Sequence, residues 1–294
     1  MKWENLRRSS NVEDFRSSDF SRVRSGGGGL RYIFPIAKFL LGSKIGRIIL
    51  LIGVIVWGVS SFLGYDPLSF LNATQTNQNI SRKISKQDEK SAQFVSAVLA
   101  ETEDVWGKLF RQSGMNYVEP KLVLFRNGIK SGCGYASSQT GPFYCQVDQK
   151  VYLDLSFFNE LSRKYHSSGD FAQAYVVAHE IGHHVQNLLG TLQKAHRLKR
   201  GVSKKTANAI QVKVELQADC YAGVWAHYLN AVLEDGDIQE ALHAASAIGD
   251  DTLQKQAQGY VVPDAFTHGR SVDRVRWFKT GYLGGKFSSC RTGI

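Results

Sequence analysis

Residues 178–186 read AHEIGHHVQ, and this stretch decides the fold because its polar and apolar positions alternate with helical spacing. Asp170 followed by Gln173 is typical of a helix N-terminus, and Gly190 is typical of the position just beyond a helix end. The sequence therefore predicts a helix over 171–189 that carries this stretch near its centre.

Two histidines and a glutamate lie close together on this predicted helix. At about 100° per residue, His179 and His183 are about 40° apart on one face, and Glu180 is about a quarter turn away. Neutral imidazoles four residues apart can bind one divalent cation, and the carboxylate can act as a base on a water molecule there. The alternative is a pair of solvated histidines, but residues 171–193 contain no Lys, Arg or Asp. The opposite face is apolar and suited to packing: Val177, Ile181, Val185 and Leu188.

A hydrolytic zinc site needs three protein ligands and an open fourth position, so a third ligand must come from elsewhere. The longer pattern H-E-x-x-H-x-x-G-x-x-H is excluded, since Gln186 and Leu189 occupy its Gly and final His positions. Residues 213–229, KVELQADCYAGVWAHYL, place Glu215 and Asp219 four residues apart on one face of a second helix. We predict Glu215 as the third ligand and Asp219 as the acceptor that fixes a histidine tautomer. A solvated acidic pair is the alternative.

The net charge of +10 is concentrated near the N-terminus. Residues 1–65 hold ten Lys and Arg against four Asp and Glu, a net of +6, which leaves +4 for the rest of the chain. Residues 48–65, IILLIGVIVWGVSSFLGY, are 18 residues without a charge, close to the roughly 20 that span a bilayer. With Lys44 and Arg47 before it, this segment predicts a transmembrane helix. A buried core helix and a cleaved signal peptide are the alternatives.

This prediction divides the chain into four parts. Residues 1–44 are expected to form a basic, flexible cytoplasmic tail, 45–65 the transmembrane helix and 66–87 a polar linker. Residues 88–294 are expected to form the globular domain. By the positive-inside rule, the N-terminus is cytoplasmic and the domain is extracytoplasmic, on the periplasmic side in a Gram-negative cell. The expected location is therefore the cell membrane, with a single pass.

The globular part is predicted to be α+β and predominantly helical, with a small sheet. An amphipathic helix is expected over 88–110, and strands are expected over 121–126 and 150–155. After Asp154 the periodicity is almost wholly helical.

The four cysteines are compatible with an oxidising compartment. Cys133 and Cys145 flank a Gly-rich loop whose ends can meet if it is a hairpin, and we predict a disulfide between them. Cys220 and Cys290 either pair or stay reduced, because spacing does not decide between these states. The sequence contains no C-x-x-C, which disfavours a cysteine zinc site.

The combination of HEIGHH with ELQAD resembles the gluzincin-type metallopeptidases, in which the second glutamate ligand lies on the next major helix in an E-x-x-x-D arrangement. More narrowly, the chain is similar over its whole length to the neutral zinc metallopeptidases of bacteria, the YpfJ-like family. This similarity is carried by four blocks: GPFYCQVDQKVYLDLSFF (141–158), AYVVAHEIGHHVQNLLG (174–190), VELQADCYAGVWAHY (214–228) and FTHGRSVDRVRWFKTGY (266–282). The resemblance implies a zincin-like catalytic domain facing the extracytoplasmic side.

The resemblance also assigns roles to two further segments. It implies that VYLDLSF, residues 151–157, is the edge strand that holds an extended peptide by main-chain hydrogen bonds, with core packing as the alternative. It implies that His268 stabilises the oxyanion of the reaction, with a solvated loop histidine as the alternative. His184 points about 140° from His179 and is not expected to bind the metal.

We therefore expect a membrane-anchored hydrolase with one Zn²⁺ per chain, bound by His179, His183 and Glu215, in which Glu180 is the general base for cleavage of a peptide or protein substrate. The rival interpretation is a catalytically silent zincin-like scaffold that acts as a membrane-tethered binding protein. A nucleic acid partner is disfavoured, because the basic residues within 194–205 are more typical of a solvated loop.

Overall fold

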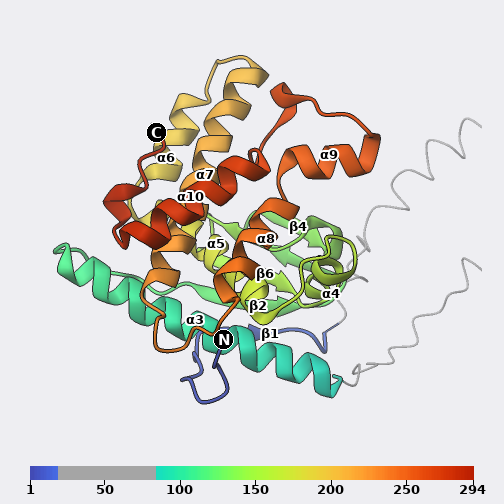
Figure 1. Ribbon diagram of the computed structural model, residues 1–294, viewed down its shortest axis with the longest axis vertical. Helices are drawn as coiled ribbons and strands as arrows, with labels where there is room; N and C mark the ends of the chain where they lie inside the picture. The colour runs from blue at the N-terminus through green and yellow to red at the C-terminus, as the bar shows by residue number, and fades with distance from the viewer. Residues whose placement is uncertain (19–83) are drawn as a thin grey trace, which may run out of the picture. The chain divides into compact units, whose positions relative to one another are not determined.

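The computed structural model of the chain describes residues 1–18 and 84–294, which belong to one unit (Figure 1). Seven of the described helices follow the sheet in sequence, so the C-terminal half is helical. The α-helices are α3 (Lys86–Gln112), α4 (Ser156–Arg163), α5 (Asp170–Leu188), α6 (Thr191–Leu198), α7 (Lys204–His227), α8 (Asp237–Ala247), α9 (Asp250–Gln258) and α10 (Ser271–Gly284). Short 3₁₀ turns are η2 (Ser138–Thr140), η3 (Pro263–Ala265) and η4 (Phe287–Ser289).

A four-stranded sheet has the order β1-β2-β6-β5, in which β5 alone runs antiparallel to its neighbour. Its strands are β1 (Val12–Asp14), β2 (Lys121–Phe125), β5 (Phe143–Cys145) and β6 (Lys150–Asp154), and a separate hairpin pairs β3 (Gly128–Ser131) with β4 (Gly134–Ser137).

The two faces of the sheet pack against different partners because side chains alternate along each strand. Leu122 and Leu124 of β2 join the main core, which the helices complete. Val123 and Phe125 of the same strand join a smaller core with Ile129 of the hairpin. The sheet therefore connects the helical part of the molecule with the hairpin.

Several predicted elements are confirmed. The fold is α+β and mainly helical, with one small sheet and a hairpin in the described residues. The helix predicted over 88–110 spans Lys86–Gln112, and that predicted over 171–189 spans Asp170–Leu188. The two predicted strands are β2 and β6. Because Ser85 caps α3 with its side chain, the folded domain begins slightly before residue 88, within the predicted linker.

The start of α5 differs from the predicted capping arrangement. Gly169 occupies the cap position and has no side chain that could cap the helix, while Asp170 is the first helical residue. The carboxylate of Asp170 instead accepts a hydrogen bond of 2.7 Å from the amino group of Met1. The backbone N–H of Phe171 donates to Glu240 of α8, so other parts of the chain satisfy this helix end.

The predicted flexible tail over 1–44 is wrong for residues 1–18, which are folded against the rest of the unit. β1 pairs in parallel with β2, and the Met1 and Trp3 side chains are buried in the main core. Arg16 is also buried, and its guanidinium bonds to Asp14 and Glu89. The polar, basic composition of this segment suggested disorder, but its few apolar residues and its ion pairs find partners far away in sequence.

The predicted transmembrane helix, 45–65, lies outside the described residues, as do 19–44 and 66–83. Among the residues that the structure describes, no helix is both long and apolar enough to cross a bilayer. A single crossing between residues 18 and 84 would put β1 and β2 on opposite sides of the membrane. The predicted orientation and the observed strand pairing therefore exclude one another.

The strand assigned to the sheet edge is also corrected. β6 lies between β2 and β5, so it is an interior strand and not the edge. The strand at this edge of the sheet is β5, whose Phe143 and Tyr144 line a cavity that also contains His179 and His183. The alternating pattern of β6 arises because both of its faces are buried, one against each core.

Both pairs of cysteines form disulfides. The predicted Cys133–Cys145 bond is confirmed and joins the β3–β4 hairpin to β5. Cys220 and Cys290, whose state the sequence left open, are bonded to each other and join α7 to the C-terminal segment.

Candidate metal centre

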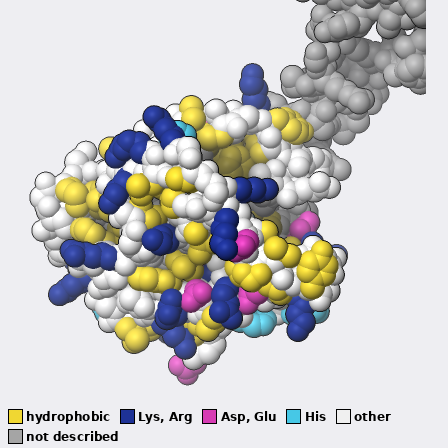
Figure 2. Space-filling view, turned by 90° about the horizontal axis from the view of Figure 1, so that it is seen from above, with side chains coloured by type: hydrophobic (Ala, Val, Ile, Leu, Met, Phe, Trp, Pro, Cys, Tyr) yellow, Lys and Arg dark blue, Asp and Glu magenta, His cyan; other side chains and the backbone are white. Residues whose placement is uncertain are grey.

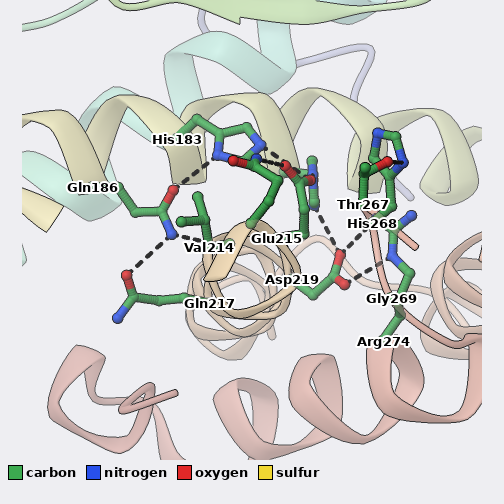
Figure 3. Close-up of polar contacts among 12 residues, drawn as sticks. His183, Gln186, Val214, Glu215, Gln217, Asp219, Thr267, His268, Gly269 and Arg274 are labelled. Carbon is green, nitrogen blue, oxygen red and sulfur yellow. Dashed lines mark hydrogen bonds and ion pairs between the residues drawn. The ribbon is translucent and has the colours of Figure 1, made fainter. Parts of the chain in front are cut away.

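Two helices bring the three predicted ligands together. α5 carries His179 and His183, and α7 carries Glu215. Figure 3 shows the side chains of His183 and Glu215 next to each other. The helices approach closely because Gly182 has no side chain: a Cβ at this position would lie 2.9 Å from the carbonyl oxygen of Ala218. The residue between the two histidine ligands therefore sets the distance to the helix that carries the glutamate.

The donor atoms have the spacing that a tetrahedral zinc ion requires. Oε2 of Glu215 lies 3.3 Å from Nε2 of His179 and 3.4 Å from Nε2 of His183. One ligand atom from each of the three residues lies within 4.8 Å of the others. In a tetrahedral site with bonds of about 2.0–2.1 Å, neighbouring ligand atoms are about 3.3 Å apart. The residues present therefore fit a zinc ion without rearrangement of the two helices.

His179 is oriented by a buried ionic cluster. Its Nδ1 lies 2.8 Å from Oδ1 of Asp219, which leaves Nε2 for the metal. Arg274 of α10 binds both oxygens of Asp219, at 2.9 and 3.0 Å, and the hydroxyl of Tyr175 donates to the same carboxylate. Burial raises the pKa of Asp219, but Arg274 and His179 outweigh it and hold this pKa at about 2. Asp219 therefore stays ionised beneath the ligand.

His183 and Glu215 are oriented by side-chain amides. Nδ1 of His183 lies 2.8 Å from Oε1 of Gln186. The amide of Gln211 donates to Oε1 of Glu215 at 2.7 Å, and Lys199 in turn donates to Gln211 at 2.7 Å. Oε2 is the oxygen that faces the histidines, so Gln211 holds the carboxylate by its other oxygen.

The electrostatics of the centre favour a bound positive charge. Burial lowers the pKa of His179 and His183, but the neighbouring carboxylates outweigh it and raise both. Burial raises the pKa of Glu215, yet the two histidines hold it well below its usual value. Such a set of groups holds either a proton or a metal cation, so metal binding would release a proton.

Glu180 lies on the wall of a cavity of about 920 Å³ that the two histidines and Glu215 also line. Ligand sites are typically about 300–1,000 Å³. Glu180 is buried, and its carboxylate has no hydrogen-bond partner among the described residues. It is therefore free to bond to a molecule in the cavity.

His268, the late histidine predicted near the site, also lines this cavity. The loop that carries it is wrapped around Asp250, whose Oδ2 accepts the backbone N–H groups of Thr267, His268 and Gly269 at 2.6–2.8 Å. Oδ1 of Asp250 is 3.3 Å from Nδ1 of His268. This contact raises the pKa of His268, although burial opposes the shift.

His184 is not part of the centre, as its direction on the helix predicted. Its Nε2 lies 2.6 Å from the carbonyl oxygen of Val118, so Nε2 carries the proton, and its Nδ1 lies 3.0 Å from the hydroxyl of Tyr144. Burial lowers the pKa of His184 to about 4. This neutral histidine joins α5 to the edge strand β5.

The loop predicted for the basic residues within 194–205 is wrong for most of them. Lys194 and Arg197 lie in α6, and Lys204 and Lys205 begin α7, which leaves only Lys199 and Arg200 between the helices. Figure 2 shows Lys and Arg side chains spread over one face of the molecule among hydrophobic and uncharged ones, without a single basic patch. That nucleic acid is not a partner of this protein stays a prediction.

The residues that support the site were not predicted, among them Arg274, Gln186, Gln211 and Asp250. Two of them follow helical spacing, because Gln186 is three residues after His183 and Gln211 is four residues before Glu215. That spacing could have identified both. Arg274 and Asp250 contact the site only through tertiary packing, which helical periodicity does not reveal.

An H-E-x-x-H helix packs against a second helix with E-x-x-x-D, beside a small mixed sheet, which is the arrangement expected from the resemblance to zinc metallopeptidases. The chain belongs to the family described as "Putative neutral zinc metallopeptidase", which matches residues 1–293. The family implies zinc as the metal.

One group of relatives is similar over the whole chain, and another is similar over about 60% of it. The chain is 46% identical to the "Uncharacterized protein YpfJ" of Escherichia coli K12 over 99% of this chain and 98% of that protein. It is 47% identical to "Uncharacterized protein Mb2605" of Mycobacterium bovis over 60% of this chain and 63% of that protein. No solved structure matches the chain.

Proposed function

We propose that this protein is a peptidase that hydrolyses peptide bonds with one Zn²⁺ per chain, held by His179, His183 and Glu215. The observation that carries the proposal is the separation of 3.3 and 3.4 Å between Oε2 of Glu215 and the two Nε2 atoms, which matches the edge of a zinc tetrahedron. Three protein ligands leave a fourth position for water or substrate, as in hydrolytic zinc sites.

The chain's own residues supply acid–base chemistry and orientation. When bound, zinc lowers the pKa of a coordinated water and polarises the scissile carbonyl. Glu180, unbonded on the cavity wall, takes the proton from the attacking water and returns it to the leaving amine. His268, held by Asp250, offers an N–H to the carbonyl oxygen as negative charge develops there. No covalent intermediate with the protein is needed.

The proposed substrate is a peptide or protein segment that enters the cavity in extended form. The edge strand β5 lines the cavity with Phe143 and Tyr144, and its outer side has no neighbouring strand in the described sheet. Free main-chain groups on such an edge can pair with an extended peptide. The rival interpretation, a silent scaffold, does not explain an unbonded buried Glu180 beside the three ligands.

A location at the membrane with the domain outside the cytoplasm is part of the proposal. The two disulfides favour an oxidising compartment. Since β1 belongs to the domain's sheet, residues 1–18 must share its side of the membrane. Ser10→Cys and Lys279→Cys, both at exposed positions, should both react with a membrane-impermeant maleimide in intact cells. Absence of labelling at either position in intact cells, with labelling after lysis, would contradict this arrangement.

The catalytic proposal is tested with the full chain, by zinc analysis and digestion of a peptide library. Glu180→Gln should keep zinc and fold but lose turnover by at least about 10²-fold, since it lacks the base. Glu160→Gln is the matched control, because Glu160 lines the same cavity from α4, while the ligands lie on α5 and α7, so this change should leave turnover unchanged. A parent protein without bound zinc, or a Glu180→Gln variant as active as the parent, would refute the proposal.

A further inference from the structure

Three hydrogen bonds connect His183 with the C-terminal segment through two buried glutamines. Figure 3 shows the first two, from His183 to Gln186 and from Gln186 to Gln217. Nδ1 of His183 is 2.8 Å from Oε1 of Gln186. Nε2 of Gln186 donates to the carbonyl of Val214 at 2.7 Å and to Oε1 of Gln217 at 3.0 Å. Nε2 of Gln217 donates to the carbonyl of Cys290 at 2.8 Å. The series links a metal ligand to a segment more than 100 residues away in sequence.

The direction of every bond in this series is fixed by backbone carbonyls. A carbonyl can only accept, so the carbonyl of Cys290 requires the NH₂ group of Gln217 to face it. The carbonyl of Val214 likewise requires the NH₂ group of Gln186. Oε1 of Gln186 must then face His183, and because this oxygen can only accept, Nδ1 of His183 must carry the proton. Nε2 of His183 is left with its lone pair toward Glu215.

We propose that Gln186 is a positioning residue that holds His183 in the tautomer able to bind zinc, and that the carbonyl of Cys290 anchors it through Gln217. This inference deepens the proposed function and rests on it. The role is the counterpart, for the second histidine, of the role that Asp219 has for the first.

Burial makes each hydrogen bond in this series hard to replace. Gln186 is 0% exposed and Gln217 is 9% exposed, so water cannot readily replace a lost partner. Cys290 is held in place by its disulfide with Cys220, which directly follows Asp219 in α7. One disulfide therefore lies next to the support of both histidine ligands.

The experiment compares zinc affinity, measured by chelator competition, across variants of the full chain. Gln186→Met keeps the volume of the side chain but removes the acceptor, and zinc binding should weaken about 10- to 100-fold. Gln186→Glu keeps an oxygen toward Nδ1, and because burial favours the protonated carboxyl, its O–H can replace the NH₂ group as the donor to the carbonyl of Val214. Zinc affinity should therefore fall by less than about tenfold. Gln217→Met leaves the Val214 bond in place, so its loss should fall below that of Gln186→Met.

Gln193→Met is the matched control, because this amide bonds to Asn187 and does not contact a ligand. Urea unfolding of the metal-free proteins separates stability from affinity: a purely structural role would lower stability in Gln186→Met and leave zinc affinity unchanged. If Gln186→Met does not fold, Gln217→Met against Gln193→Met carries the test. Parent-like affinity in the folded variants, or an equal loss in Gln186→Glu and Gln186→Met, would overturn the inference. Failure of the parent to bind zinc would instead refute the proposed function.

Discussion

His179 and His183 lie about one turn apart on α5, but the side chains that support them differ in chemistry. Figure 3 shows the two supports, Asp219 with Arg274 and Gln186 with Gln217. The support of His179 is ionic: the Asp219 carboxylate lies between the imidazole and the Arg274 guanidinium. The support of His183 is neutral, consisting of the amides of Gln186 and Gln217 and a backbone carbonyl. Both leave Nε2 free for the metal, so one function is met by a charged and by an uncharged arrangement.

The two supports should differ in how much stability the protein loses when one partner of the support is removed. Asp219 is 0% exposed and Arg274 is 2% exposed, so removal of either leaves a buried charge without its partner. Such a loss typically costs about 3–5 kcal/mol. A buried amide left unsatisfied costs about 1–3 kcal/mol. The ionic support should therefore dominate stability, while both supports should affect zinc affinity.

Arg274→Met is expected to have the largest effect, because it leaves Asp219 ionised and buried. The free energy of unfolding of the metal-free protein, measured with urea, should fall by about 3–5 kcal/mol. The control is Arg276→Met on the same helix, whose side chain is 66% exposed beside Asp273. That change should stay within about 0.5 kcal/mol. If the Arg274 and Gln186 variants lost equal stability, the contrast between an ionic and a neutral support would not hold.

Acid should destabilise the protein through a third histidine before it affects the ionic support. Burial lowers the pKa of His184 to about 4, below the value of about 6.5 in the unfolded chain. The unfolded chain therefore takes up the proton first. The stability present above pH 6.5 is lost as the pH falls through 4, by about 3 kcal/mol in total. Asp219, with its pKa at about 2, is still ionised in this range.

The variant that isolates this effect is His184→Gln, whose amide can still donate to the carbonyl of Val118 but does not titrate. Urea unfolding at pH 7, 5.5 and 4 should show a flatter dependence on pH in this variant than in the parent. An equally steep loss in both proteins would assign the acid sensitivity to other groups, the ionic support among them.

The same contrast explains how much of the site could be predicted from sequence. The three ligands, Glu180 and Asp219 lie on two helices at fixed spacing, so periodicity alone indicated which side chains share a face. Arg274 was missed because its partner lies on another helix, and burial of an arginine leaves no periodic pattern. Gln186 was dismissed after it ruled out a longer histidine motif, although it shares the face of His183.

The fold shows the same division between local and long-range information. Helix and strand positions followed from local patterns, with α3 and α5 within two residues of their predicted bounds. The two errors had different causes. β1 was assigned to a flexible tail because a three-residue strand that pairs with a distant partner is too short to predict alone. β6 was placed at the edge because the family resemblance implied it, although a local hairpin with β5 gives β6 a second neighbour.

Gly182→Ala should sharpen the comparison by changing the distance between the helices that carry both supports. The added Cβ would lie 2.9 Å from the carbonyl oxygen of Ala218, and backbone cannot rotate away. Overpacking of this kind costs about 1–3 kcal/mol. Zinc affinity should fall too, since α7 carries Glu215. The measurements are urea unfolding and chelator competition.

The control for this change is Gly107→Ala in α3, where the nearest atom to an added Cβ is the flexible end of Arg111 at 3.3 Å. Alanine is the better helix former, so this variant should gain up to about 1 kcal/mol. A Gly182→Ala protein with parental stability and zinc affinity would show that the helix contact is not what sets the ligand spacing.

Gln211→Met should have the smallest effect, and it tests whether a neutral support matters equally for every ligand. Lys199 can only donate, so it fixes the amide of Gln211 with its NH₂ group toward Glu215. Without the Gln211 donor, Glu215 keeps its negative charge and therefore its attraction to the metal. His183 differs, because without Gln186 nothing holds it in the tautomer that binds the metal through Nε2. Zinc affinity should therefore fall by no more than about tenfold, with Asn208→Ala on the same helix as an unaffected control. A loss larger than that of Gln186→Met would mean that orientation of the carboxylate, and not the tautomer of His183, limits zinc binding.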